Sequence, residues 1–145
     1  MPKQNQDKIL NYSKEQMFNL VADIDSYDEF LPWCSKSTVI SKNNIDDNNY
    51  EIIADLEIGY QSLSYTYRSR VILSNKSNFI KVSLIKGPFK YLINEWEFIK
   101  LDKNICKVKF FIDFEINIKL FNHLIAEFFE IAFNKMVKSF EDRAK

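Results

Sequence analysis

The feature that most constrains the fold is a segment near the C-terminal end whose apolar residues would point in almost every direction around a helix. Between residues 121 and 140 the apolar positions are Phe121, Leu124, Ile125, Phe128, Phe129, Ile131, Ala132, Phe133, Met136, Val137 and Phe140. A helix on a protein surface needs an apolar stripe only about 100° wide. We therefore expect one long helix that is covered on several sides, or that itself covers an apolar molecule.

Composition narrows the class of protein. A chain of 145 residues is expected to form one domain over residues 1–145 with a real core, and its aromatic content of 15% includes 13 Phe. The 20 Lys and Arg balance 20 Asp and Glu, and the arginines are Arg68, Arg70 and Arg143. A net charge of zero argues against a DNA-binding protein.

The sequence carries no recognisable signal for secretion or membrane insertion and few cysteines, and these features indicate where the protein is located and whether its cysteines are reduced. Residues 1–10 are polar, unlike the apolar part of a secretory signal, and no window approaches the roughly 18 continuous apolar residues of a membrane-spanning helix. We therefore expect a cytoplasmic protein. Cys34 and Cys106 are too few and too isolated for a disulfide framework or a zinc site, so we expect both to be reduced and buried.

The rest of the chain predicts strands that follow two short helices. Residues 4–11 indicate a weak first strand, and Ser13 with Gln16 forms a capping box that starts a helix over residues 14–22. A second short helical turn is expected over residues 26–30. Period-two alternation then predicts about six strands, at residues 38–42, 50–58, 61–73, 79–86, 91–101 and 106–116.

Short connections join these strands. Gly59 and the pair Gly87–Pro88 are turn signals, and residues 43–49 form a polar turn. Consecutive strands with short turns indicate an antiparallel sheet with one solvated face. The long C-terminal helix is the natural cover for the other face, so the predicted fold class is α+β.

Four local strings carry a resemblance to a known family. Residues 17–24 read Met-Phe-Asn-Leu-Val-Ala-Asp-Ile and lead into Tyr-Asp-Glu-Phe-Leu-Pro-Trp-Cys at residues 27–34. Gly-Pro-Phe follows at residues 87–89, and Asp-Phe-Glu lies in the last strand at residues 113–115. Over nearly its whole length the chain resembles the coenzyme Q-binding START-domain family, which is polyketide cyclase-like and includes the bacterial ribosome-association toxin. Asp28 stands where that family usually has proline, and Lys36 where glycine is common.

The resemblance implies a START-like helix-grip fold. In this fold a curved antiparallel sheet wraps around a long C-terminal helix, two short helices lie near the N-terminus, and an apolar tunnel runs between sheet and helix. The implied function is noncatalytic binding of ubiquinone or a related isoprenoid lipid, in support of respiratory electron transport. Ubiquinone would be a bound ligand and not a required cofactor, and peripheral contact with the inner face of the cytoplasmic membrane is expected.

The resemblance also implies an alternative from a different class. This is a toxin that binds the ribosome, through its large subunit, and inhibits association of the ribosomal subunits. Candidate partners for ribosomal RNA phosphates are Arg68, Arg70, Lys107 and Lys109.

The expected ligand-contacting residues come from the strands, the long helix and the loop at residues 27–34. They are Phe30, Leu31, Trp33, Leu56, Tyr67, Trp96, Phe110, Phe114, Leu124, Phe128 and Met136. An ordinary packed core is the alternative for each of them. In the loop, the apolar residues around Pro32 either plug one end of the sheet or form a gate at a membrane surface.

Residues suited to catalysis are sparse. His123 is the one histidine, and no nucleophile can be assigned beside it. Two carboxylate pairs, at residues 55 and 57 and at 113 and 115, alternate with the apolar face and should be solvated, which does not separate their pKa values for acid–base work. No phosphate-binding loop or metal-ligand spacing is present. We therefore expect a protein that is not an enzyme, because an aromatic polyketide cyclase would need acid–base groups inside the cavity.

Overall fold

The computed structural model describes residues 3–30, 34–60, 63–116 and 138–144. The elements in chain order are β1 (Lys3–Leu10), α1 (Lys14–Ala22), the 3-10 helix η1 (Ile24–Glu29), β2 (Cys34–Asn44), β3 (Asn49–Tyr60), β4 (Leu63–Ser74), β5 (Phe79–Lys86), β6 (Phe89–Asp102) and β7 (Ile105–Ile116). Residues 138–144 are helical. The predicted sequence of elements up to the last strand is therefore present.

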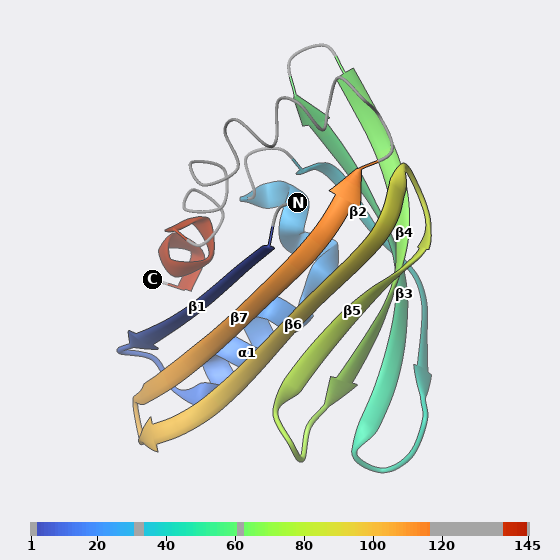
Figure 1. Ribbon diagram of the computed structural model, residues 1–145. Helices are drawn as coiled ribbons and strands as arrows, with labels where there is room; N and C mark the ends of the chain where they lie inside the picture. The colour runs from blue at the N-terminus through green and yellow to red at the C-terminus, as the bar shows by residue number, and fades with distance from the viewer. Residues whose placement is uncertain (1–2, 31–33, 61–62, 117–137, 145) are drawn as a thin grey trace.

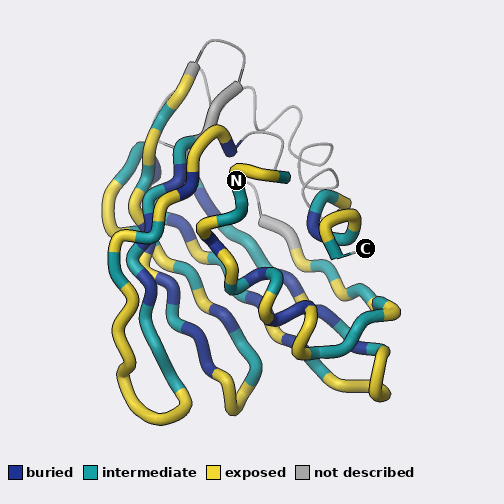
Figure 2. The backbone as a smooth tube through the Cα atoms, turned by 180° about the vertical axis from the view of Figure 1, so that it is seen from behind, coloured by how far each residue is buried: buried dark blue, intermediate teal, exposed yellow. Residues whose placement is uncertain are grey.

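The strands form one antiparallel sheet of seven, in the order β1-β7-β6-β5-β4-β3-β2 (Figure 1). Each pairing from β2 to β7 joins strands that are consecutive in the chain, whereas β1 is added at the edge beside β7. The sheet is curved, and α1 lies within the curve. Seen from behind, α1 and the helical residues 138–144 lie in front of the same face (Figure 2). This arrangement confirms a curved antiparallel sheet that holds helices on its concave face.

The helix α1 matches its prediction at both ends because its start is encoded locally. The Ser13 hydroxyl accepts a hydrogen bond from the Gln16 backbone N–H at 3.1 Å, and the Gln16 side chain accepts one from the Ser13 N–H at 2.9 Å. The apolar side chains Met17, Phe18 and Val21 are buried against the sheet. The ring of Phe18 meets that of Phe98 edge-on, with centroids 5.6 Å apart.

Two strand boundaries differ from the prediction. Gly59 does not form a turn: it pairs with Ser64 inside the β3–β4 ladder. The strand β2 begins well before residue 38, with register shifts between Cys34 and Lys36 and between Val39 and Ser41. Bulges of this kind shift the side-chain alternation, which is the signal that sequence reading uses to find a strand.

The core lies on the concave face of the sheet and under α1. Both cysteines are buried and free, as predicted. Most of the predicted long helix falls on residues 117–137, which lie outside the described residues. At its end, Phe140 lies on the helical residues 138–144 and is buried in the core. Within the described parts of the chain, no helix is long and apolar enough to cross a membrane.

Candidate functional site

The predicted ligand-contacting residues on the strands share the concave face of the sheet. Cross-strand register places Leu56 opposite Tyr67 and Trp96 opposite Phe110. Leu56, Trp96, Phe110 and Phe114 are buried, and Tyr67 is half-buried. The structure therefore brings these predicted residues to one face, and it divides their aromatic rings between two clusters. Leu31, Trp33, Leu124, Phe128 and Met136 lie outside the described residues.

The first cluster, called here the Trp96 cluster, consists of Trp96, Phe98, Phe110, Phe140, Tyr27 and Phe30. The Trp96 ring meets Phe110 edge-on at a centroid distance of 4.6 Å and stacks on Phe98 at 6.2 Å. Phe140 packs against Trp96 at 5.1 Å. It also packs against Tyr27 at 5.5 Å and Phe30 at 5.1 Å. One side chain of the C-terminal helical residues therefore joins the sheet to η1.

The indole N–H of Trp96 is held within the protein. It donates a hydrogen bond to the Asn94 side-chain oxygen at 3.0 Å, and the Asn94 amide donates to the Phe111 carbonyl at 2.9 Å. A buried indole needs such a partner. Because these bonds use internal acceptors, the orientation of Trp96 is set by β6 and β7.

Ion pairs hold the helical residues 138–144 on both sides of Phe140. The Lys8 ammonium on β1 pairs with Glu141. The Arg143 guanidinium donates to Glu29 at 2.8 Å and lies 5.3 Å from the ring centroid of Phe30. These contacts fasten the end of the chain to the first strand and to the end of η1.

The second cluster, called here the Tyr67 cluster, consists of Tyr67, Phe89 and Phe114. The Tyr67 and Phe89 rings meet edge-on at 5.2 Å, and Phe89 meets Phe114 at 6.0 Å. Gly87 makes this packing possible: it has a φ of +153°, and a Cβ placed on it would lie 2.5 Å from the Cβ of Tyr67. The Gly-Pro-Phe string therefore has a structural cause, since its glycine lets the turn approach Tyr67 and its phenylalanine packs on the Tyr67 ring.

Phe30 belongs to the packed end of the concave face. Its ring contacts Phe140 and Tyr27, which agrees with the predicted plug for this residue. The gate interpretation depends on Leu31 and Trp33, outside the described residues, and stays a prediction. The backbone N–H of Asp28 donates to the Ser37 hydroxyl at 3.1 Å, so the residue that departs from the family pattern helps to join η1 to β2.

Three titratable groups, the hydroxyls of Tyr27 and Tyr67 and the thiol of Cys34, are held uncharged near neutral pH. Burial raises the pKa of the Tyr27 hydroxyl, which donates to the Val21 carbonyl, and that of Tyr67 far above their ordinary values. Burial, with a smaller effect from Asp28, raises the pKa of the Cys34 thiol to about 11. A base at neutral pH requires a pKa near 7, and these shifts move in the opposite direction.

The strand carboxylates pair with cations. Asp55 accepts two hydrogen bonds from Arg68, at 2.8 and 3.1 Å, and these hold the pKa of Asp55 below its usual value. Glu51 pairs with Arg70, Glu115 with Lys90, and Asp7 with Lys107. In the described residues no group of three or more His, Cys, Asp or Glu is placed to hold a metal ion. Three of the four cations predicted to meet RNA phosphates, Arg68, Arg70 and Lys107, thus already have carboxylate partners.

Sequence reading missed several residues of the concave face. Phe89 was noted only as part of the Gly-Pro-Phe string and was not predicted to contact a ligand. Asn94 is a polar residue on an apolar face of its strand, and no sequence pattern predicts its role. Gln6 faces inward from β1 opposite Phe110. The first strand reads as weak because Gln6 and Lys8 occupy inward positions where an apolar residue is expected.

Comparison with known proteins establishes the family. Residues 10–141 match the family described as polyketide cyclase/dehydrase and lipid transport. The chain is 42% identical over 141 residues to a protein of Rickettsia prowazekii named ribosome association toxin RatA, covering 95% of this chain and 92% of the relative. It is 30% identical over 144 residues to the coenzyme Q-binding protein COQ10 homolog B of Xenopus laevis, covering 97% of this chain and 57% of that relative. The chain belongs to this START-like family.

Solved structures share the fold. A START superfamily protein from Mycobacterium smegmatis superposes with a TM-score of 0.78 at 15% identity, covering 98% of this chain and 96% of that one. The Zhui aromatase/cyclase from Streptomyces superposes with a TM-score of 0.79 at 13% identity, covering 99% and 93%. At these identities the likeness concerns the fold alone. It supports the START-like architecture that the sequence predicted.

Proposed function

We propose that this chain binds ubiquinone or a related isoprenoid lipid, without catalysing a reaction, between the concave face of the sheet and the C-terminal segment. The observation that carries the proposal is the absence of charge along the described concave face of β3 to β7. The buried side chains there are Ile52, Ala54, Leu56, Ser69, Val71, Leu73, Ile80, Phe89, Leu92, Trp96, Phe98, Cys106, Val108, Phe110 and Phe114. The START-like family and the relative named as coenzyme Q-binding support the same ligand class.

Such a surface suits a long apolar tail. Each buried methylene of a ligand contributes about 0.8 kcal/mol, so an isoprenoid chain gains affinity without any charged contact. Aromatic edges of the Tyr67 cluster offer a surface for an unsaturated chain or ring. The protein would remove the tail from water and carry the lipid at the inner face of the cytoplasmic membrane toward the respiratory complexes.

Native purification followed by lipid mass spectrometry tests this proposal. Organic extraction of the purified protein is expected to yield an isoprenoid quinone in near-stoichiometric amount. Protein stripped of lipid should take up added ubiquinone. An empty extract from protein that also fails to take up ubiquinone would remove the proposal.

A second candidate function is association with the ribosome. The relative that favours it is named as a ribosome association toxin and matches 95% of this chain at 42% identity. Against it, Arg68 and Arg70 are already paired with Asp55 and Glu51, so binding RNA phosphates through them would require those ion pairs to break. Salt-sensitive co-sedimentation with the large ribosomal subunit, together with growth arrest on overproduction, would support this function. A quinone carrier predicts neither result.

A further inference from the structure

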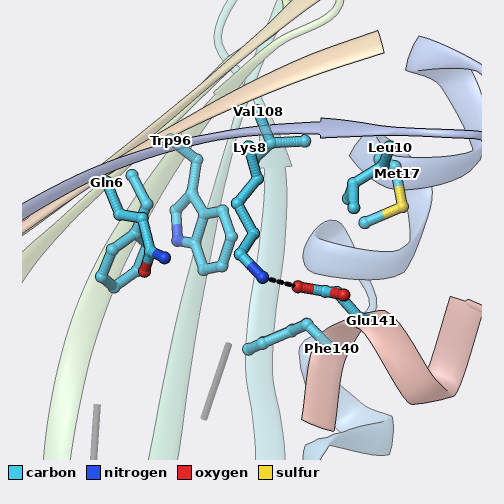
Figure 3. A pocket seen from close by; sticks show the side chains of 9 residues that line it. Gln6, Lys8, Leu10, Met17, Trp96, Val108, Phe140 and Glu141 are labelled. Carbon is cyan, nitrogen blue, oxygen red and sulfur yellow. Dashed lines mark hydrogen bonds and ion pairs between the residues drawn. The ribbon is translucent and has the colours of Figure 1, made fainter. Parts of the chain in front are cut away.

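A small cavity lies between β1, the Trp96 cluster and the C-terminal helical residues (Figure 3). Its volume is about 30 Å³, which is room for one or two groups the size of a water molecule. Trp96, Phe110 and Phe140 form aromatic walls, while Gln6, Lys8 and Glu141 supply its polar groups. The cavity therefore combines an apolar lining with a few polar side chains.

Gln6 has an unmet hydrogen-bonding requirement at this cavity. Among the described residues, its side-chain oxygen Oε1 is buried and accepts no hydrogen bond. Figure 3 shows the Gln6 side chain beside Trp96 and Lys8, with Phe140 and Glu141 across from them. Leaving a buried acceptor unpaired costs free energy comparable to a lost hydrogen bond, so this atom requires a donor.

Two neighbouring donor groups already have acceptors of their own. The Trp96 indole N–H donates to Asn94, and the Lys8 ammonium pairs with Glu141. The side chains of the remaining lining residues, Leu10, Met17, Val108, Phe110 and Phe140, carry no N–H or O–H group. A hydroxyl group that enters the cavity can donate to Gln6 Oε1, whereas a carbonyl oxygen would bring a second acceptor against the first.

We propose that this cavity is a subsite for a hydroxyl group on the head group of the bound lipid, so that the chain prefers a hydroquinone to the corresponding quinone. This inference rests on the proposed lipid binding and adds the redox form of the ligand. The cavity is too small for an aromatic ring, so the ring lies outside and one hydroxyl reaches Gln6. At this position the hydroquinone presents a hydroxyl that can donate a hydrogen bond, whereas the quinone presents a carbonyl oxygen that can only accept one.

Anaerobic equilibrium dialysis with decyl-ubiquinol and decyl-ubiquinone tests the preference. Wild-type protein is expected to bind the quinol about tenfold more tightly, which corresponds to about 1.4 kcal/mol. The Gln6→Leu variant should bring the ratio of the two dissociation constants to about one, with a melting temperature at or above that of the wild type. Asn5→Ala changes the neighbouring, exposed residue of β1 and should leave the ratio unchanged.

The outcomes separate this inference from the function on which it rests. A wild-type ratio near one, or an unchanged ratio in Gln6→Leu, overturns the subsite while lipid binding stands; in that case the cavity holds water alone. Wild-type protein that binds neither form overturns both. The wild-type ratio needs no variant, so a ratio near one overturns the subsite even if Gln6→Leu does not fold.

Discussion

The Trp96 cluster and the Tyr67 cluster lie on the same concave face and are held in different ways. The Trp96 cluster draws rings from η1, β6, β7 and the C-terminal helical residues, and ion pairs flank it on two sides. The Tyr67 cluster draws its rings from three strands and depends on the close approach of Gly87. The difference favours a mainly structural role for the first cluster, with the proposed head-group subsite at its edge, and contact with the rest of the lipid for the second.

Removing the central ring of the Trp96 cluster should have the largest effect. Trp96→Ala deletes a side chain that is 7% exposed and contacts three other rings, so we expect a loss of about 4 kcal/mol in the free energy of unfolding. Denaturant unfolding followed by circular dichroism measures it. Ile93→Ala, at an exposed position on the same strand, should cost less than about 0.5 kcal/mol. Similar losses in both variants would contradict the central role of Trp96.

A smaller loss of stability, with a larger loss of ligand, is expected at the Tyr67 cluster. Gly87→Ala places a methyl group against the Cβ of Tyr67 at a φ that side chains rarely adopt, which should cost about 2–3 kcal/mol. The displaced Tyr67 and Phe89 rings should reduce ubiquinone retention in the dialysis assay. Full retention in a folded Gly87→Ala variant would argue that the Tyr67 cluster does not contact the lipid.

The ion pairs beside the Trp96 cluster should contribute modestly. Glu141→Gln and Arg143→Gln remove the pairs with Lys8 and Glu29, and each is expected to lower the free energy of unfolding by at most about 1 kcal/mol. The difference from wild type should shrink in 1 M salt, because added ions screen exposed charges. Lys138→Gln, in an exposed pair along the helix, serves as the matched control. A salt-independent loss would point to packing instead of charge.

The smallest effect should come from the thiol of Cys34, a group that contributes to the raised pKa values of both Tyr27 and Tyr67. Its pKa of about 11 is raised above that of an unfolded thiol, so its contribution to stability is fully present below about pH 9 and is lost as the pH rises through 11. Cys34→Ala should therefore flatten, without abolishing, the decline of stability over that interval. Unfolding curves at pH 8, 9.5 and 11 measure the slope. An unchanged slope would contradict a buried, protonated thiol.

Elements whose signals are local could be predicted from the sequence. The helix α1 was placed correctly at both ends because Ser13 and Gln16 cap it within one turn. Gly59 was misassigned because a glycine signals a turn only where the ladder ends, and the ladder runs past it to Tyr60. The start of β2 was not predicted for a similar reason. Its bulges interrupt the alternation of apolar and polar residues, and its pairing with β3 cannot be derived from that alternation.

The candidate site was predictable in its apolar part alone. Trp96, Phe110 and Phe114 follow from alternation within single strands, so their shared face could be derived. The contacts of Gln6 and Lys8 could not be derived in this way. They depend on the pairing of β1 with β7 and on the contact between Lys8 and Glu141, which lie near opposite ends of the sequence. The two clusters likewise arise from the curvature of the sheet, which no single strand encodes.

The pairing of β1 with β7 has a consequence for synthesis of the chain. Lys3 meets Asp113, so the first strand to leave the ribosome cannot find its partner until the last strand has been made. At roughly 5–20 residues per second this wait is on the order of ten seconds. The hairpins from β2 to β7 can form in the meantime, and closing so long a loop makes docking of β1 a late, slow event. Until then one edge of β7 stays open to pairing with other chains, and the polar side chains of β1 keep the waiting strand soluble.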